Sequence, residues 1–204
     1  FKQRDKNINI PGIFSLFRCI NCNGIFLNPQ PSYKESGKFY PKNEYYSLEK
    51  IKTEEDSIKT KIKLILYKVY FSENKNIVKS VIFLPIKFLV RGSIIKKGIK
   101  LLDVGAGSGQ FLYEMKSLGL EVYGVEPGKF DEEGNKKYNL NIKKGDIKSA
   151  KYKKNFFNII TLNHVLEHTN NPNETLSEIK RLLKKNGTFI MSIPNTNSLA
   201  FKIF

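Results

Sequence analysis

A glycine-rich loop between an apolar strand and an amphipathic helix constrains this chain more than any other feature. The loop reads Asp-Val-Gly-Ala-Gly-Ser-Gly over residues 103–109, directly after the apolar run Leu101-Leu102. Apolar residues at helical spacing follow over residues 111–118. Glycine lets a ligand approach the backbone closely and allows positive φ angles. The loop therefore predicts a ligand site beyond the carboxyl end of a strand in an α/β fold.

Strand and helix patterns alternate from Lys100 onward. Further strands are expected at 121–126, near 141, at 156–162 and at 187–193, and further helices at 129–138 and 173–184. Such alternation is typical of a parallel sheet that is covered by helices on both faces. We therefore predict an α/β fold with a Rossmann-like, doubly wound, mostly parallel sheet.

Differences in amino-acid composition divide the chain into three regions. Residues 1–47 form an aromatic-rich arm with two cysteines, and residues 48–98 form a Lys- and Ile-rich helical cap or linker. Helices are expected there at 58–69 and 77–90, and the core occupies residues 99–204. Because the chain begins with Phe1 rather than Met, we expect it to be a fragment.

Composition and charge exclude several classes of protein. The chain is 40% hydrophobic and 26% charged, as in soluble globular proteins, and two cysteines are too few for a disulfide framework. Its longest apolar stretch, 77–90, is shorter than the roughly 20 residues of a membrane-spanning helix. The net charge of +16 raises the possibility of nucleic-acid or anionic-membrane binding. However, the basic residues are spread along the whole chain.

The acidic residues around the loop indicate the kind of ligand. The glycines follow G-x-G-x-G rather than the dinucleotide pattern G-x-G-x-x-G, because the sixth position is Gln110. Asp103 stands two residues before the first glycine, where a carboxylate suits a cationic amine or sulfonium better than a pyrophosphate. Glu126 ends the next strand, 23 residues after Asp103, where it can accept hydrogen bonds from ribose hydroxyls. Asp146 follows the third strand.

The ordered motifs resemble those of class I S-adenosylmethionine-dependent methyltransferases over residues 99–195. The motifs are Leu-Leu-Asp-Val-Gly-Ala-Gly-Ser-Gly-Gln-Phe-Leu at 101–112, Gly-Val-Glu-Pro at 124–127, Gly-Asp at 145–146 and Leu-Lys-Lys-Asn-Gly-Thr at 183–188. The resemblance implies that S-adenosylmethionine is the cofactor. The residues implied in its binding are Asp103, Gly105, Ala106, Gly107 and Gly109 at the methionine end, Glu126 with Pro127 at the ribose, Asp146 with Ile147 at the adenine, and Asn163 near the methyl group.

The resemblance also implies an activity and a location. We expect a cytoplasmic enzyme that transfers a methyl group to a small molecule, sugar or glycan, with oxygen favoured as the acceptor atom. The family sheet normally has two more strands, so the core at 99–204 is expected to be truncated at its C-terminal end. One alternative is an RNA methyltransferase that uses the basic surface. Another is a non-catalytic membrane- or anion-binding module that uses the Lys-rich helices.

Two histidines follow the fourth expected strand of the core. His164-x-x-Glu167-His168 matches a zinc-peptidase pattern, but five-residue patterns recur by chance. In a methyltransferase, His164 or His168 is a candidate general base near the acceptor. Glu167 and His168 also fit part of a metal-binding trio found in some O-methyltransferases, although His164 replaces its first glutamate. The structural alternative is that Glu167 caps or pairs locally and that His168 packs beneath the sheet. No Asn/Asp-Pro-Pro-Tyr/Phe run follows this strand, which disfavours methylation of nucleobase amines.

The two cysteines have the spacing of half a zinc site. Cys19-x-x-Cys22 places two thiols where a zinc knuckle holds two corners of a tetrahedron. The surrounding Pro- and aromatic-rich arm resembles the segment that precedes many bacterial methyltransferases of the broad type 11/23 group. In those proteins, an earlier cysteine pair completes a zinc ribbon. The alternative is a pair of reduced thiols.

Overall fold

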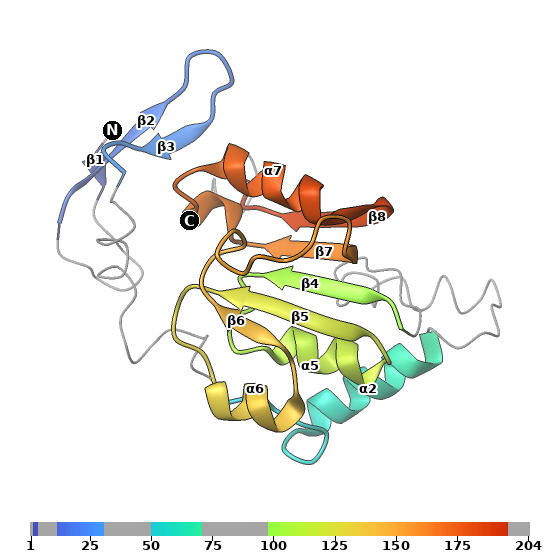
Figure 1. Cartoon of the computed structure of the whole chain (residues 1–204). Coiled ribbons are helices and arrows are strands. Elements are labelled where there is room, and N and C mark those ends of the chain that lie inside the picture. The colour runs from blue at the N-terminus through green and yellow to red at the C-terminus, as the bar shows by residue number, and fades with distance from the viewer. Residues whose placement is uncertain (1, 4–11, 31–49, 71–97, 196–204) are drawn as a thin grey trace. The chain divides into compact units, whose positions relative to one another are not determined.

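A computed structural model of the protein describes residues 2–3, 12–30, 50–70 and 98–195. Its largest feature is a sheet of five parallel strands in the order β6-β5-β4-β7-β8 (Figure 1). The strands are β4 (Lys100–Val104), β5 (Glu121–Glu126), β6 (Ile142–Lys144), β7 (Phe157–Asn163) and β8 (Leu183–Ser192). The order reverses direction at β4, which is where ligands bind in open α/β sheets.

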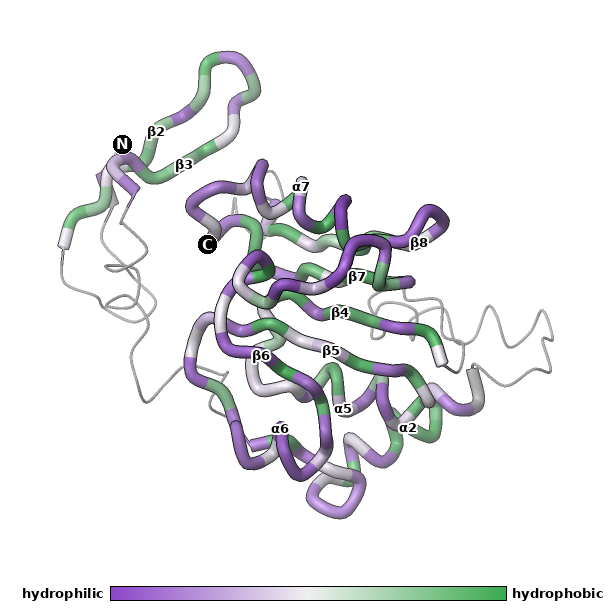
Figure 2. Tube along the Cα trace, viewed as in Figure 1, coloured by the Kyte–Doolittle hydropathy of each residue, from purple (hydrophilic) through white to green (hydrophobic). Residues whose placement is uncertain are grey.

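Successive residues of each central strand point to opposite faces of the sheet, and each face has its own core. Leu101 packs on the face covered by α2 (Ile58–Tyr70), α5 (Gln110–Ser117) and α6 (Glu132–Tyr138). Leu102 packs on the opposite face, against α7 (Pro172–Leu182). Both leucines are fully buried. The predicted doubly wound α/β fold is therefore confirmed, and Figure 2 shows hydrophobic residues concentrated along its central strands.

The C-terminal helix and strand differ from the sequence prediction. Helix α7 ends at Leu182 rather than 184, and β8 begins at Leu183 rather than 187. Pairing between β7 and β8 jumps from Phe157–Leu183 to Ile159–Thr188. The hydrophilic residues 184–187 therefore form a bulge at the start of the strand, because they are looped out of the ladder. Helix α6 begins at Glu132 rather than 129, because Asp131 caps it by accepting a hydrogen bond from the Gly134 N–H (2.9 Å).

Residues 50–70 and 98–193 belong to one compact unit that runs from Tyr45 to Ile193. A second unit contains three short antiparallel strands in the order β1-β2-β3: Lys2–Gln3, Phe14–Arg18 and Ile25–Leu27. The turn between β2 and β3 carries both cysteines. The helix expected at 58–69 is present as α2, whereas the one expected at 77–90 lies outside the described residues. Among the described helices, none has the length and hydropathy to cross a bilayer.

Candidate functional site

The loop after β4 is shaped by glycines that other residues could not replace without strain. Gly105, Gly107 and Gly109 have φ angles of +74°, +55° and +85°. The N–H groups of Gly105 and Ala106 both donate to the carbonyl oxygen of Val125 on β5 (2.9 and 3.0 Å). A Cβ built on Gly105 would overlap Cγ2 of Val165, which follows β7. The loop is thus held between the ends of β5 and β7, with no room for a side chain at its first glycine.

Glu126 reaches from the end of β5 to this loop. Its side chain is buried, with Oε2 accepting a hydrogen bond from the Gly107 N–H and Oε1 accepting one from the Gly128 N–H, both at 2.8 Å. A carboxylate has about four acceptor positions, so about two remain after these bonds. Two oxygens held rigidly by backbone donors are a suitable acceptor for a pair of neighbouring hydroxyl groups.

The protonation of Glu126 reflects its burial. Burial raises the pKa of Glu126 above its ordinary value of 4.5, and the negative charge of Asp103 raises it further. The hydrogen bonds from Gly128 and Gly107 oppose that rise, because they stabilise the ionised carboxylate. Two acidic side chains therefore lie close enough to influence each other beside the loop, and together they favour a ligand that carries positive charge.

Asp103 is fixed by a residue that the sequence analysis missed. The hydroxyl of Thr161 donates to Oδ1 of Asp103 at 2.6 Å, and both side chains are fully buried. The two residues lie directly opposite each other on β4 and β7. Thr161 is the one polar residue in the apolar run Ile159–Leu162, and that interruption was the available signal. The bond holds the first acid of the loop in place.

The other residues implied in cofactor binding lie at the same edge of the sheet. The Gly145 N–H donates to the carbonyl oxygen of Glu126 (2.9 Å), so Asp146 follows a strand end adjacent to that of β5. Asp146 is exposed and accepts a hydrogen bond from the Ser149 N–H (2.7 Å), and Pro127 is exposed as well. Asn163 ends β7 and is half-buried. Ile147 is buried in the core on the α7 face.

The two histidines lie in a turn rather than a long helix. His164 has a φ of +53°, and its Nδ1 atom lies 3.4 Å from Oε1 of Glu167. His168 is exposed at the end of a three-residue 3-10 helix, Leu166–His168. Zinc peptidases of the H-x-x-E-H type need both histidines on one α-helix, so that alternative is not supported. The local pairing of Glu167 is present, but the expectation that His168 packs beneath the sheet is wrong, because its side chain is exposed. The catalytic roles of His164 and His168 stay predictions.

The described residues do not bring together a full set of ligands for either metal site that the sequence suggested. In the parts of the chain that the structure describes, no three His, Cys, Asp or Glu side chains gather as a metal site would require. The trio of His164, Glu167 and His168 is therefore not assembled. Cys19 and Cys22 form no disulfide in the turn of the β2–β3 hairpin, and hydrogen bonds from the backbone of Cys22 and Asn21 lower the pKa of the Cys19 thiol. The zinc prediction for this pair still requires further ligands.

Residues 50–56 form a segment, here called the strap, that is hydrogen-bonded to the first residue of α5. The sequence did not predict this contact. The Lys52 N–H donates to Oε1 of Gln110 (2.8 Å), and Nε2 of Gln110 donates to the Lys52 carbonyl oxygen (3.1 Å). Nε2 also donates to buried Glu114 (3.2 Å), which pairs with Lys63 of α2 (2.6 Å). Ile51 is buried beside Gly109. Gln110 therefore connects the strap, α5 and the last glycine of the loop.

Replacing Gln110 with alanine is expected to lower the free energy of unfolding by about 1.5–4.5 kcal/mol. The variant loses two hydrogen bonds to the strap and one to Glu114, each worth about 0.5–1.5 kcal/mol net. Urea unfolding followed by circular dichroism measures the change. Ser117→Ala is the control on the same helix, since the Ser117 hydroxyl bonds only within α5. Equal losses in both variants would contradict the connecting role of Gln110.

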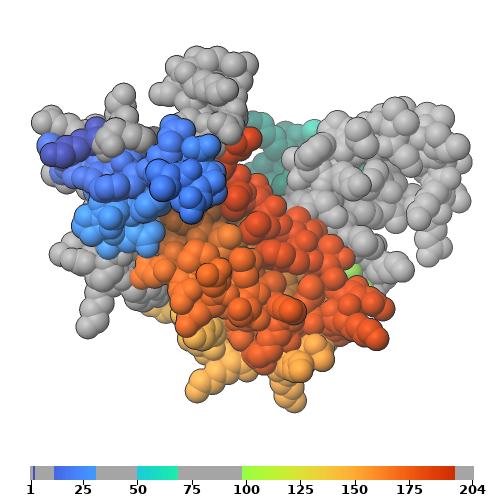
Figure 3. Space-filling model, turned by 90° about the horizontal axis from the view of Figure 1, so that it is seen from above, coloured from blue at the N-terminus to red at the C-terminus, as the bar shows by residue number. Residues whose placement is uncertain are grey.

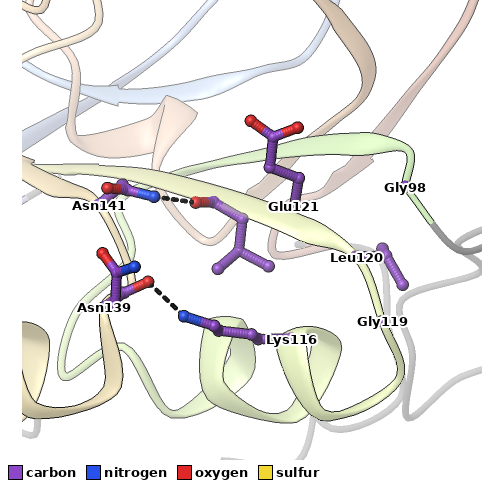
Figure 4. A pocket seen from close by; sticks show the side chains of 8 residues that line it. Gly98, Lys116, Gly119, Leu120, Glu121, Asn139 and Asn141 are labelled. Atoms are coloured by element: carbon purple, nitrogen blue, oxygen red, sulfur yellow. Dashed lines mark hydrogen bonds between the residues drawn. The ribbon is translucent and has the colours of Figure 1, made fainter.

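A surface hollow lies at the opposite end of the sheet from the loop. It is formed around the turn that precedes β5, and its lining includes Lys116, Glu121 and Asn141 (Figure 4). The Lys116 ammonium donates to the carbonyl oxygen of Asn139 (2.7 Å), and the Asn141 amide donates to that of Val122 (3.2 Å). These polar groups already serve the fold, so the hollow does not compete with the loop as the candidate site.

The residues around the loop fit S-adenosylmethionine. The three glycines turn the loop sharply with positive φ angles. Glu126 offers two hydrogen-bond acceptors for a ribose diol, and Asp103 with Glu126 supplies negative charge for the amine and sulfonium. Gly107 and Gly128 keep the Glu126 carboxylate in one orientation before any ligand binds. These residues lie at the carboxyl end of the sheet, where the reversal of strand order at β4 also predicts ligand binding.

Curated relatives match part of this chain. A ubiquinone biosynthesis O-methyltransferase of Pelagibacter ubique is 33% identical over 105 residues, covering 48% of this chain and 43% of the relative. An uncharacterized protein of Methanocaldococcus jannaschii is 32% identical over 139 residues, covering 68% of this chain and 62% of the relative. The chain thus spans between about two fifths and three fifths of the length of these relatives.

Solved structures and a family model also match this chain. A SAM-dependent methyltransferase from Aquifex aeolicus gives a TM-score of 0.47 at 22% identity, with 67% of this chain and 74% of that chain covered. A Pyrococcus horikoshii protein gives 0.48 at 23% identity, with 68% and 64% covered. The family model described as a methyltransferase domain matches residues 79–202, more than half of the sequence. The chain therefore belongs to the class I S-adenosylmethionine-dependent methyltransferase family.

Proposed function

We propose that this protein transfers a methyl group from S-adenosylmethionine to an oxygen of a small-molecule, sugar or glycan acceptor. The observation that carries the proposal is the buried Glu126 carboxylate, which backbone donors on Gly107 and Gly128 hold against the glycine loop. Family membership supports the cofactor. The name of the Pelagibacter relative, an O-methyltransferase, supports oxygen as the acceptor atom.

The residues at the carboxyl edge of the sheet would each have a role in cofactor binding or in methyl transfer. When bound, S-adenosylmethionine supplies a sulfonium methyl group for in-line attack by the acceptor. Asp103 and Glu126 would hold the cofactor by charge and hydrogen bonds, and Asn163 would lie beside the reacting groups. His164, in the turn after β7, would accept the hydroxyl proton of the acceptor, with Glu167 orienting its ring. His168 is the second candidate base.

Calorimetric titration of the chain with S-adenosylhomocysteine tests the cofactor part of this proposal. Binding in the micromolar range is the expected result. Incubation with radiolabelled S-adenosylmethionine and simple phenols or sugars tests the acceptor part, and His164→Ala is expected to lower the rate by about 100-fold or more without changing cofactor affinity. A folded protein that does not bind S-adenosylhomocysteine would contradict the proposal.

Cofactor affinity is expected to fall when the pH is lowered. Ribose hydroxyls donate to the ionised Glu126, and burial raises the pKa of Glu126 above 4.5. A raised pKa means that the folded protein takes up a proton at a higher pH than an ordinary glutamate does. Affinity should therefore increase with pH up to the raised pKa and level off above it. Titrations between about pH 5 and pH 8 measure this trend. Glu126→Gln, which cannot ionise, should show a flatter profile.

A further inference from the structure

The end of the sheet opposite the cofactor site carries a dense group of basic side chains. Residues 150–158 contain three lysines, residues 179–192 contain three lysines and one arginine, and neither segment contains an acidic residue. The first segment leads into β7, and the second comprises the end of α7 and all of β8. The bulge at residues 184–187 lies within the second segment and appears in Figure 2 as a hydrophilic projection beside the β8 label.

Backbone hydrogen bonds place the two basic segments next to each other. The Asn155 N–H donates to the carbonyl oxygen of Arg181 (3.0 Å), and the Phe156 N–H donates to that of Leu182 (2.8 Å). The Arg181 guanidinium also donates to the Tyr152 carbonyl oxygen (2.8 Å). In Figure 3, the orange and red segments that include α7 and β8 adjoin on the visible surface. The lysines of both segments therefore share one region of the molecule. We call four of their exposed members, Lys153, Lys154, Lys180 and Lys185, the basic face. Lys151 is left out, because the residue before it, Ala150, donates to the carbonyl oxygen of Asp146 (3.3 Å).

In the described parts of the chain, the acidic residues near the basic face form their salt bridges with other cations. Glu178, on the last turns of α7, pairs with Arg181 (2.6 Å), and Glu121, at the start of β5, pairs with Lys100 (2.6 Å). Elsewhere, Lys63 and Lys148 each have a glutamate partner. Within residues 2–3, 12–30, 50–70 and 98–195, by contrast, the salt bridges include no lysine of the basic face.

The basic face and the cofactor site are separated by the length of the strands. Asp103, Glu126 and Asp146 gather at the carboxyl ends, whereas the basic face surrounds the amino ends of β7 and β8. A strand of seven residues such as β7 spans about 23 Å. An anion on the basic face would therefore leave the acidic site accessible to a cationic cofactor.

We propose that the basic face binds the phosphate backbone of nucleic acid. Exposed lysines act as point charges that release counterions from phosphates without reading base edges. None of the large apolar residues exposed in the described parts belongs to residues 150–158, and the only one within 179–192 is Met191, so the face offers no exposed aromatic ring for base stacking. The expected binding is independent of sequence. It would hold the protein on nucleic acid, while the proposed methyl acceptor would bind at the other end of the sheet.

Fluorescence anisotropy with labelled oligouridylate and with duplex DNA of equal length tests this proposal across a series of salt concentrations. The test variant replaces four exposed lysines of the basic face: Lys153→Ala, Lys154→Ala, Lys180→Ala and Lys185→Ala. The control variant removes the same charge from exposed lysines of α2 and α6: Lys59→Ala, Lys61→Ala, Lys136→Ala and Lys137→Ala. Circular dichroism and the affinity for S-adenosylhomocysteine check that both variants are folded, and the anisotropy result does not depend on the proposed function.

Each phosphate contact contributes about 0.7–0.9 to the slope of log K against log salt. The test variant is expected to lose about 3 from that slope, and at least tenfold in affinity near 0.1 M salt, while the control variant loses less than a third as much in slope. Equal losses in the two variants would overturn the proposal, because net charge alone would then explain binding. Absence of binding at low salt would overturn it as well. So would tighter, lysine-dependent binding to phosphatidylserine vesicles than to either oligonucleotide.

Discussion

Glu126→Ala is expected to weaken the binding of S-adenosylhomocysteine by about 10- to 150-fold. The variant removes a buried carboxylate that would accept hydrogen bonds from the ligand, and bonds to a charged group are worth about 1.5–3 kcal/mol. It also leaves the N–H groups of Gly107 and Gly128 without their acceptor, so the loop keeps only its backbone bonds to Val125 at the end of β5. Isothermal titration calorimetry measures the loss directly.

The same strand provides a matched control for this variant. Glu121 begins β5 as Glu126 ends it, but its exposed carboxylate pairs with Lys100 at the opposite edge of the sheet. Glu121→Ala removes the same charge and should leave the dissociation constant within about twofold, because exposed ion pairs contribute little. If both variants lose affinity equally, the assignment of the cofactor site to the glycine-loop edge is wrong. If only Glu126→Ala loses affinity, the site and its ribose acceptor are established together.

Local sequence patterns predicted the core of the fold because each of its elements has a clear signal. The strand at Glu121–Glu126 has the predicted bounds, and Gly105, Gly107 and Gly109 adopt the positive φ angles that a glycine-rich turn suggests. The boundary between α7 and β8 was less predictable. Residues 184–187 are hydrophilic and follow a helix without a break in the sequence, so only their exclusion from the β7–β8 ladder reveals the bulge.

The contacts that complete the site join residues far apart in the chain. Thr161 and Asp103 are hydrogen-bonded although they are 58 residues apart in the sequence, and the same separation holds for Gln110 and Lys52. Strand register decides the first contact, and the path of the strap decides the second. Neither can be deduced from local spacing. The sequence could identify which residue types surround the loop, but not which neighbours orient them.

Gly105→Ala is expected to lower the free energy of unfolding by about 2–5 kcal/mol and to weaken cofactor binding as well. Two causes add together at this position. The φ of +74° costs a residue with a Cβ about 1–2 kcal/mol, and the new methyl group would overlap Cγ2 of Val165, where overpacking costs about 1–3 kcal/mol. Urea unfolding measures the first effect, and titration with S-adenosylhomocysteine measures the second.

A double-mutant cycle with Val165→Ala separates the two causes. Removing the Cγ atoms of Val165 takes away the overlap but leaves the backbone conformation of residue 105 unchanged. The double variant should therefore be free of the overpacking cost. The sum of the losses in unfolding free energy of the two single variants should exceed the loss of the double variant by about 1–3 kcal/mol. Strictly additive losses would show that Val165 does not confine the loop. In that case the backbone angle alone requires glycine at position 105, and the turn after β7, which carries His164, is free to move independently of the cofactor loop.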